Sequence, residues 1–405
     1  MPVDRPVLRV GLVCPYSLTV PGGVQQQVLG LARVLRRMGV EARVLGPCDG
    51  PPPATYVTPL GNSIPTAANG SIVPLAPDPS CTLRTIRAVR DEDFDVLHVH
   101  EPLVPGPTTT ALLLDTVPVV GTFHAAGDSS SYRYLGPPLR WLIRHIDVRC
   151  VVSKDAQDLV ERFFGGTYRM LFNGVELELF RGVEPHKTTG PTIFFCGRHE
   201  PRKGLAVLLE AMQGLPDDVT CWVASDGPET AELTARFAHD RRIEWLGRIS
   251  DDEKIARLAG ADAFVAPSLH GESFGVVLIE AMAAGTPVVA TDLAGYLNVA
   301  TPEQDALMVP PGDVDALRAA LARVLDDPAL AARLRSAGLV RAESFSMEAL
   351  ARAYLEIYEE LAGQGRRRET RSGGRWRSRI VQWARPMLRH VLAWARRAAI
   401  FRTRS

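Results

Sequence analysis

Two glutamates eight positions apart could together bind a sugar. Glu272 stands in a glycine-containing loop ahead of an apolar run, and Glu280 lies two helical turns further on. A carboxylate in so apolar a run needs partners, because an unpaired buried charge is costly. Sugar hydroxyls are suitable partners, since they donate as well as accept hydrogen bonds. A helix cap and a salt-bridge partner are the alternative roles for the two carboxylates.

Cations and glycines that could bind phosphate stand at two other places. Arg198 and Lys203 belong to the segment 197–204, between a predicted strand and the next helix. Two cations beside a helix N-terminus can hold a pyrophosphate and neutralise the charge that develops when it leaves. Gly22 and Gly23 follow the first strand and open the first helix, where glycines admit a ligand to free N–H groups. A solvated basic turn and a tight strand-to-helix turn are the structural alternatives.

A repeated alternation of strands and helices must position these residues. Extended apolar segments are expected at 8–13, 41–45, 95–100, 117–123 and 148–153, and again at 192–196, 219–224, 243–246, 263–266 and 287–291. Residues 24–38 and 346–361 show the helical period. Such alternation, with almost continuously apolar strands, indicates parallel sheets covered on both faces. A Gly- and Pro-containing stretch at 180–191 is typical of a linker between two such units.

The predicted fold class is therefore α/β, with two Rossmann-like, doubly wound parallel-sheet domains facing a cleft. Ligands bind such sheets at the carboxyl ends of the strands. We expect a first domain at 1–182, a second at 190–345, a helix packing back on the body at 346–362 and a basic tail at 363–405.

The composition is that of a globular protein. The chain has 405 residues, of which 46% are hydrophobic and 23% charged, so two or three domains are expected and complete disorder is excluded. No apolar stretch approaches the ~20 residues needed to span a bilayer, and no signal peptide is visible. Six scattered cysteines without a Cys-x-x-Cys pair argue against a disulfide framework or a zinc site. We therefore expect a cytoplasmic location.

The neutral net charge hides a strongly basic C-terminal segment. Residues 366–405 hold 13 arginines, no lysine and one glutamate, a local charge of +12, so residues 1–365 carry −12. Apolar residues recur there at helical spacing, with Pro386 as a kink: Ile380, Trp383, Met387, Val391, Trp394, Ala398 and Phe401. A basic amphipathic helix with tryptophan on its apolar side is typical of an interfacial membrane anchor. A disordered tail and a helix for a protein partner are the alternatives; the acidic body disfavours nucleic acid.

Taken together, the E-x7-E element, the two cations and the Gly-Gly loop resemble the retaining family-4 glycosyltransferases of GT-B fold, from about residue 8 to residue 361. Within that family the chain is most similar to the actinobacterial phosphatidylinositol mannosyltransferases. The segments that carry this likeness are Val13-Cys14-Pro15-Tyr16-Ser17, residues 20–25, Ile64-Pro65, Asn69-Gly70-Ser71, residues 95–102, Thr122-Phe123-His124, residues 200–203 and residues 271–275.

The resemblance implies a role for each matching residue. The donor-binding set is Gly22, Gly23, Arg198, Lys203, Asp251, Lys254, Glu272, Ser273, Phe274, Gly275, Val276 and Glu280. The acceptor-binding set is Tyr16, Gln25, Asn69, Gly70, Ser71 and His124. The catalytic set is His124, Arg198, Lys203 and Glu272. In these roles Gly23 and the two cations bind the donor diphosphate, Glu272 holds the sugar, Glu280 binds the ribose, and His124 lies against the sugar and the acceptor hydroxyl.

The resemblance also implies a reaction, the transfer of mannose from GDP-mannose to a phosphatidylinositol-type lipid with retention of configuration. Attack on the front face of the sugar needs no base of shifted pKa, so positioning and charge stabilisation would carry the rate. No tightly bound cofactor and no metal ligand set is implied, and Mg²⁺ is compatible with the sequence without being required. The expected location is the inner face of the plasma membrane, with peripheral association through the tail.

The acceptor half departs from the pattern of the lipid-using relatives. Residues 72–74 are Ile-Val-Pro where those relatives carry a basic residue, and residues 125–128 after His124 contain no lysine. A different nucleotide-sugar donor, a soluble inositol phosphate acceptor, a nucleotide-sugar epimerase and a catalytically silent binding subunit therefore remain as alternatives. His98 and His100 could also suggest a metal site, although packing at the strand end suits them better.

Overall fold

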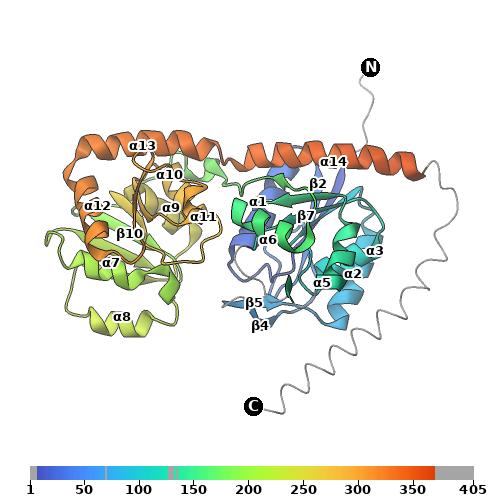
Figure 1. The fold of residues 1–405 in the computed structure, drawn as a ribbon, viewed down its shortest axis with the longest axis horizontal. Helices are drawn as coiled ribbons and strands as arrows, with labels where there is room; N and C mark the ends of the chain where they lie inside the picture. The colour runs from blue at the N-terminus through green and yellow to red at the C-terminus, as the bar shows by residue number, and fades with distance from the viewer. Residues whose placement is uncertain (1–6, 69–70, 126–131, 134–135, 370–405) are drawn as a thin grey trace, which may run out of the picture. The chain divides into compact units, whose positions relative to one another are not determined.

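The computed structural model describes residues 7–68, 71–125, 132–133 and 136–369. Two parallel sheets divide this part of the chain, one formed before residue 171 and one after residue 191 (Figure 1). Both predicted series of strands are confirmed, most of them to within two residues at either end. Each sheet alternates with helices, as the Rossmann-like prediction requires.

The first sheet has the strand order β3-β2-β1-β6-β7-β8-β9, and every neighbouring pair is parallel. Its strands are β1 (Arg9–Val13), β2 (Glu41–Gly46), β3 (Val57–Pro59), β6 (Val96–His100), β7 (Val119–Phe123), β8 (Val148–Val151) and β9 (Arg169–Met170). Its helices are α1 (Gly23–Arg37), α2 (Pro79–Asp91), α3 (Pro107–Leu114), α5 (Gly136–Leu142), the 3₁₀ turn Ile143–His145 and α6 (Lys154–Phe164).

The second sheet has the strand order β12-β11-β10-β13-β14-β15, again parallel throughout. Its strands are β10 (Thr192–Cys196), β11 (Thr220–Ala224), β12 (Ile243–Gly247), β13 (Ala263–Ala266), β14 (Val288–Thr291) and β15 (Ala306–Val309). Its helices are α7 (Leu205–Met212), α8 (Thr230–Arg236), α9 (Asp251–Gly260), α10 (Val276–Ala283), α11 (Ala294–Leu297), α12 (Val314–Asp326) and α13 (Pro328–Glu343), with 3₁₀ turns at Leu177–Phe180 and Pro201–Lys203.

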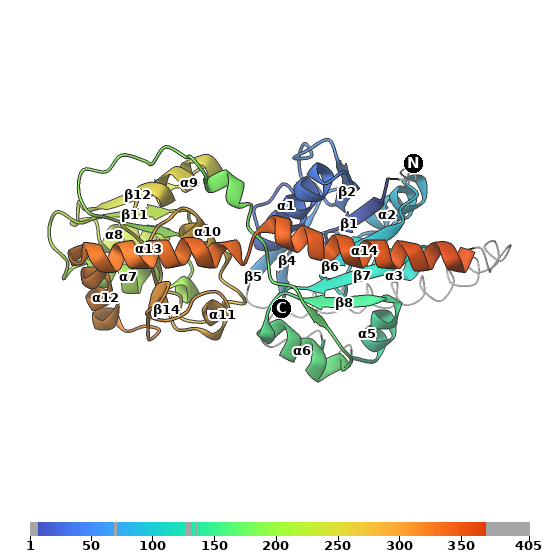
Figure 2. The same ribbon diagram turned by 90° about the horizontal axis from the view of Figure 1, so that it is seen from above.

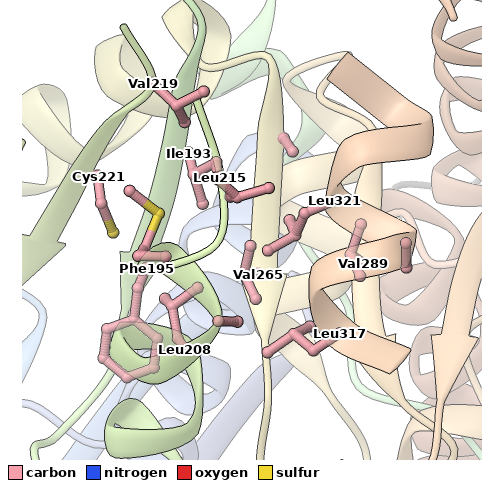
Figure 3. Packing of buried hydrophobic residues seen from close by; sticks show 14 of the residues in the cluster. Ile193, Phe195, Leu208, Leu215, Val219, Cys221, Val265, Val289, Leu317 and Leu321 are labelled. Atoms are coloured by element: carbon pink, nitrogen blue, oxygen red, sulfur yellow. The ribbon is translucent and has the colours of Figure 1, made fainter. Parts of the chain in front are cut away.

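Apolar side chains cover both faces of the second sheet. On one face Phe195 and Val265 of the strands pack against Leu208 of α7 and Leu317 and Leu321 of α12 (Figure 3). A separate cluster on the other face joins strand residues to α10. Burial on both faces explains why these strands are almost continuously apolar rather than alternating.

An antiparallel hairpin, which the sequence analysis did not include, precedes α2. Strands β4 (Ile64–Ala68) and β5 (Ser71–Leu75) pair from Ile64 opposite Leu75 to Ala68 opposite Ser71. Asn69 and Gly70, between the two strands, lie outside the described residues. An Asn-Gly pair between two extended segments is the strongest short-range hairpin signal, and it could have identified this element.

Helix α14 (Met347–Glu369) lies across β6 and β7 of the first sheet (Figure 2). Its Tyr354 and Tyr358 hydroxyls bond Thr122 of β7 and His98 of β6. The helix continues past the predicted end at Leu361, so residues 363–369 of the predicted tail are helical. Its two glycines cost only about 1 kcal/mol each in a helix interior. The predicted amphipathic helix from Ile380 onward lies outside the described residues.

Two connecting segments run side by side between the sheets. Val175 and Ser346 form a parallel bridge, in which the Val175 N–H donates to the Phe345 carbonyl and the Met347 N–H to the Val175 carbonyl. The domain boundaries at 182 and 190 stay predictions.

Candidate active site

The Gly-Gly turn lies at the N-terminus of α1, as expected. Gly22 is the extended residue before the helix, and no side chain caps the free N–H groups that follow. A Cβ added at Gly23 would meet no protein atom within 4 Å. Packing within the protein therefore does not require a glycine at position 23. The open space beside the N–H groups fits the predicted phosphate contact.

Gln25, predicted to bind an acceptor, braces its own loop in this structure. The side chain is buried, and its amide nitrogen donates to the carbonyls of Ser17 and Val20 at 3.3 and 3.2 Å. Tyr16, in the same loop, forms an antiparallel bridge with Leu75 of β5. Burial raises the pKa of the Tyr16 phenol, and the nearby Glu101 carboxylate raises it further. Tyr16 is therefore a neutral hydrogen-bonding group at physiological pH.

Lys203 and Glu272, predicted from separate motifs, form one ion pair in the second domain. The Lys203 Nζ lies 2.6 Å from the Glu272 Oε1, and the Glu272 side chain is only 11% exposed. The same oxygen accepts from Arg202 at 3.3 Å and from the Ser268 hydroxyl at 3.0 Å. Ser268 in turn lies 2.9 Å from the buried Tyr296 hydroxyl. The sugar-binding candidate is thus held between two cations and a hydroxyl.

Arg198 is the more exposed member of the predicted cation pair. Its side chain is 56% exposed, and it reaches Glu200 at 3.2 Å rather than Glu272. Glu200 also bonds Arg202 at 2.9 Å, so Arg202 bridges two carboxylates. Arg202 was seen in the basic segment but not assigned a role. Its position beside Glu272 comes from the 3₁₀ turn Pro201–Lys203, which the sequence pattern did not predict.

Glu280 has a mostly buried partner within the protein. Its carboxylate lies 2.9 Å from the Lys254 Nζ, and the two side chains are 13% and 14% exposed. Burial by itself lowers the pKa of Lys254, but the attraction of Glu280 outweighs it and raises that pKa. Asp251, at 3.6 Å from the same ammonium, is largely exposed. Three residues of the predicted nucleoside contact are therefore adjacent, from α9 and α10.

The N-terminus of α10 supplies the remaining predicted donor contacts. Gly275 has φ +97°, and a Cβ there would collide with Leu278 and Tyr296, so this position requires glycine. The Phe274 side chain is buried and stacks on Phe172 at 5.4 Å between ring centroids. The Phe274 ring thus packs in the core, so only its backbone could contact a ligand. Ser273 precedes it, and Val276 opens the helix.

His124 follows the end of β7 and is buried in a chain of histidines. Its Nε2 lies 3.0 Å from the His100 Nδ1, and the ring of His100 packs on that of His98 at 4.1 Å between centroids. Burial lowers the pKa of His124 to about 4, although a hydrogen bond with the Asn173 side chain raises it in part. His124 is therefore neutral at physiological pH. The pKa values of His98 and His100 also lie well below the usual range through burial.

Glu101 is a buried carboxylate that the sequence analysis quoted in a motif without giving it a role. Its Oε1 accepts the backbone N–H groups of His124 and Ala125 at 2.7 and 2.5 Å. Burial raises its pKa to about 7, against the lowering effect of these two hydrogen bonds. The sequence signal that could have identified this residue is a Glu-Pro pair directly after a buried strand.

Asn69 and Gly70 lie outside the described residues, and Ser71 opens β5. Among the described residues, no group of three or more His, Cys, Asp or Glu side chains could hold a metal ion. Within the same part of the chain, no helix is long and apolar enough to cross a membrane.

Comparisons with known proteins match both halves of the chain. The family model described as Glycosyltransferase Family 4 matches residues 21–179, and the model described as Glycosyl transferases group 1 matches residues 190–327. The phosphatidyl-myo-inositol mannosyltransferase of Mycobacterium leprae is 37% identical over 369 residues, which cover 88% of this chain and 98% of the relative. The protein of the same name from Mycolicibacterium smegmatis is 36% identical, with 88% and 95% covered.

Solved structures show the fold. A sucrose-phosphate synthase from Thermosynechococcus elongatus superposes with a TM-score of 0.71 at 21% identity, covering 88% of this chain and all of that one. The Anabaena HepE protein in complex with UDP superposes with a TM-score of 0.67 at 17% identity, with 88% and 100% covered. The two Rossmann-like domains are those of the GT-B fold.

Proposed function

Because the chain belongs to glycosyltransferase family 4, we propose that it transfers mannose from GDP-mannose to a phosphatidylinositol-type lipid, with retention of configuration. The named relatives at 37% and 36% identity support both the sugar and the acceptor. The observation that carries the proposal is the pairing of Lys203 with Glu272 and of Lys254 with Glu280 in the second domain. The Lys203–Glu272 pair suits a diphosphate next to a sugar, and the Lys254–Glu280 pair suits a nucleoside.

The donor diphosphate binds between the α1 N-terminus and the basic turn. Arg198, Arg202 and Lys203 neutralise the charge that develops on the diphosphate as the sugar leaves. Lys203 already lies against Glu272, so both groups are in place before the donor arrives. Glu272 then accepts hydrogen bonds from the sugar hydroxyls. We propose that these cations make a divalent metal dispensable, so that chelation with EDTA leaves transfer unchanged.

Transfer exchanges one bond at the anomeric carbon for another. The bond from that carbon to the phosphate oxygen breaks, and a bond to an inositol hydroxyl oxygen forms on the same face. The hydroxyl proton passes to the departing phosphate, so the protein needs no base of shifted pKa. His124 is neutral and therefore orients the sugar and the acceptor hydroxyl through hydrogen bonds rather than by carrying a proton.

We propose that the lipid acceptor is used at the cytoplasmic face of the membrane. The +12 charge of residues 366–405 supports peripheral binding to an anionic leaflet, at about 1 kcal/mol for each cation near the surface. The Mycobacterium tuberculosis relative named glycogen synthase, 28% identical with 92% of its length covered, favours a second candidate, a glucosyltransferase with a soluble acceptor.

Site variants test the donor half of the proposal. Lys203→Ala and Glu272→Gln should each lower kcat at least 100-fold, because both residues act on the transition state. Lys154→Ala is the matched control, since Lys154 forms an exposed ion pair with Asp158 on α6. Turnover is measured with GDP-mannose, UDP-glucose and ADP-glucose in parallel. Near-normal turnover in either site variant would remove the proposed site, and turnover with a glucosyl donor alone would favour the second candidate.

A further inference from the structure

Glu101 stands at the carboxyl end of β6 in an uncommon backbone conformation. It has φ +48°, in the left-handed region that non-glycine residues seldom adopt, and its side chain is only 3% exposed. Its own N–H still donates to the Thr122 carbonyl of β7 at 2.8 Å, so the residue continues the sheet before the chain turns. Such a conformation persists only where its surroundings determine it. The donor site described above makes no use of this carboxylate.

The Glu101 carboxylate holds the backbone of His124 and Ala125, the two residues that directly follow β7. One oxygen receives two successive N–H groups, those of His124 and Ala125. Hydrogen bonds from backbone N–H groups to a carboxylate are stronger than those to a neutral acceptor. The chain therefore leaves β7 in a direction that Glu101 sets.

His100 holds the ring of the same residue. The His124 Nε2 bonds the His100 Nδ1, whereas the buried His100 Nε2 has no hydrogen-bond partner among the described residues. If His100 carried its proton on Nε2, a buried N–H donor would be unsatisfied, which native proteins avoid more strictly than an unsatisfied acceptor. The proton therefore belongs on the His100 Nδ1, which donates to His124. His124 then carries its own proton on Nδ1.

The base of this arrangement is held by hydrogen bonds from three elements. The His98 ring, which packs on His100 at a tilt of 32°, lies 2.7 Å from the Thr122 hydroxyl and 2.6 Å from the Tyr358 hydroxyl of α14. Thr122 also lies 2.9 Å from the Tyr354 hydroxyl. Two strands and a helix thus fix the ring on which His100 rests.

We propose that Glu101 and His100 are positioning residues that act on His124, one through its backbone and one through its ring, so that His124 carries its proton on Nδ1 and is oriented for the sugar and the acceptor hydroxyl. The inference rests on the proposed function only in what His124 contacts. The clamp itself is a property of β6, β7 and α14.

The charge on Glu101 gives the clamp a pH dependence. Burial raises the pKa of Glu101 to about 7, so protonation below that pH weakens its two hydrogen bonds to the loop. The groups that face Glu101 do not titrate in this window. Burial, and then the Glu101 charge, raise the pKa values of Tyr16 and Tyr132; burial also raises that of Cys14 to about 12 and lowers that of His124 to about 4.

Enzyme kinetics with the full chain test the clamp. Glu101→Gln should lower kcat for transfer at least 10-fold with little change in the KM for the donor, and should remove the decline in kcat that the wild type shows as pH falls through about 7. Asp147→Asn is the matched control, because Asp147 accepts the Val119 N–H at the opposite end of β7. Full kcat with the decline retained in Glu101→Gln would overturn the proposal.

A measurement without substrate separates this inference from the proposed function. Nitrogen-15 NMR of histidine-labelled protein, with the His124 signals assigned from His124→Gln, should show a neutral ring protonated on Nδ1. His100→Phe should shift that ring toward the Nε2 tautomer, which is the more stable form of an unconstrained imidazole. A wild-type His124 protonated on Nε2 would overturn the clamp even if transfer were confirmed. The Nδ1 form in a protein that transfers no mannose would uphold the clamp and refute the function.

Discussion

Removing Lys254 should destabilise the second domain more than removing any exposed cation. Lys254 and Glu280 are 14% and 13% exposed and 2.9 Å apart, so Lys254→Met leaves a buried carboxylate without a partner. Breaking a buried pair in this way costs roughly 3–5 kcal/mol, whereas exposed pairs contribute about 0–1 kcal/mol. Because each side chain keeps some solvent contact, we expect a loss near the lower limit, about 3 kcal/mol of unfolding free energy.

A double variant separates stability from binding. Lys254→Met with Glu280→Leu replaces the pair by apolar groups and should return to within about 1 kcal/mol of the wild type. Urea unfolding gives these free energies, and calorimetry with GDP measures nucleotide affinity. Both variants should lose GDP binding, because Glu280, the proposed ribose ligand, is unpaired in Lys254→Met and absent in the double variant. Arg323→Met, which breaks an exposed pair with Glu303, is the control. A loss below about 1 kcal/mol in Lys254→Met, or normal GDP binding by the stable double variant, would refute the reasoning.

Three further predictions concern glycine, pH and the tail. Gly275→Ala should lower the unfolding free energy, measured in urea, by about 2 kcal/mol, because the added Cβ collides with its neighbours and the residue has a positive φ. Gly23→Ala should leave that free energy unchanged but abolish turnover of GDP-mannose in a kinetic assay. The pKa of Glu101 is about 7 in the folded protein against 4.5 for an ordinary glutamate, so Glu101 stabilises the fold most at low pH, where it is protonated. Urea titrations should show about 3 kcal/mol of unfolding free energy lost as pH rises from 4.5 to 7. Glu101→Gln should not show this loss. Truncation after Gly363 should weaken sedimentation with anionic vesicles while donor hydrolysis persists; unchanged sedimentation would contradict the membrane role of the tail.

Much of the fold was predictable because buried parallel strands are apolar throughout. Thr192–Cys196 and Ala263–Ala266 were predicted with the bounds that the structure gives, since a polar turn marks each end. The Ala306–Val309 strand was missed because the helix before it, Ala294–Leu297, is too short to give a clear helix signal. The end of α14 was misplaced because glycine lowers helix propensity without forbidding a helix.

The sequence indicated the residue types of the candidate site but not their contacts. The E-x7-E element and the basic turn identified Glu272, Glu280 and Lys203, but their partners come from other elements of the fold. Lys254 reaches Glu280 from α9, and no spacing within one motif indicates that contact. Glu101 escaped assignment because its function depends on a backbone turn that sequence alone does not reveal.

The most direct test is a product measurement with purified protein, phosphatidylinositol vesicles and GDP-mannose, read by mass spectrometry. We expect a phosphatidylinositol carrying one added hexose, formed from GDP-mannose and from no other nucleotide sugar in a panel. Proton NMR of this product should show that the α-anomeric linkage of the donor is retained. No hexosylated lipid, together with slow hydrolysis of a different nucleotide sugar, would contradict it.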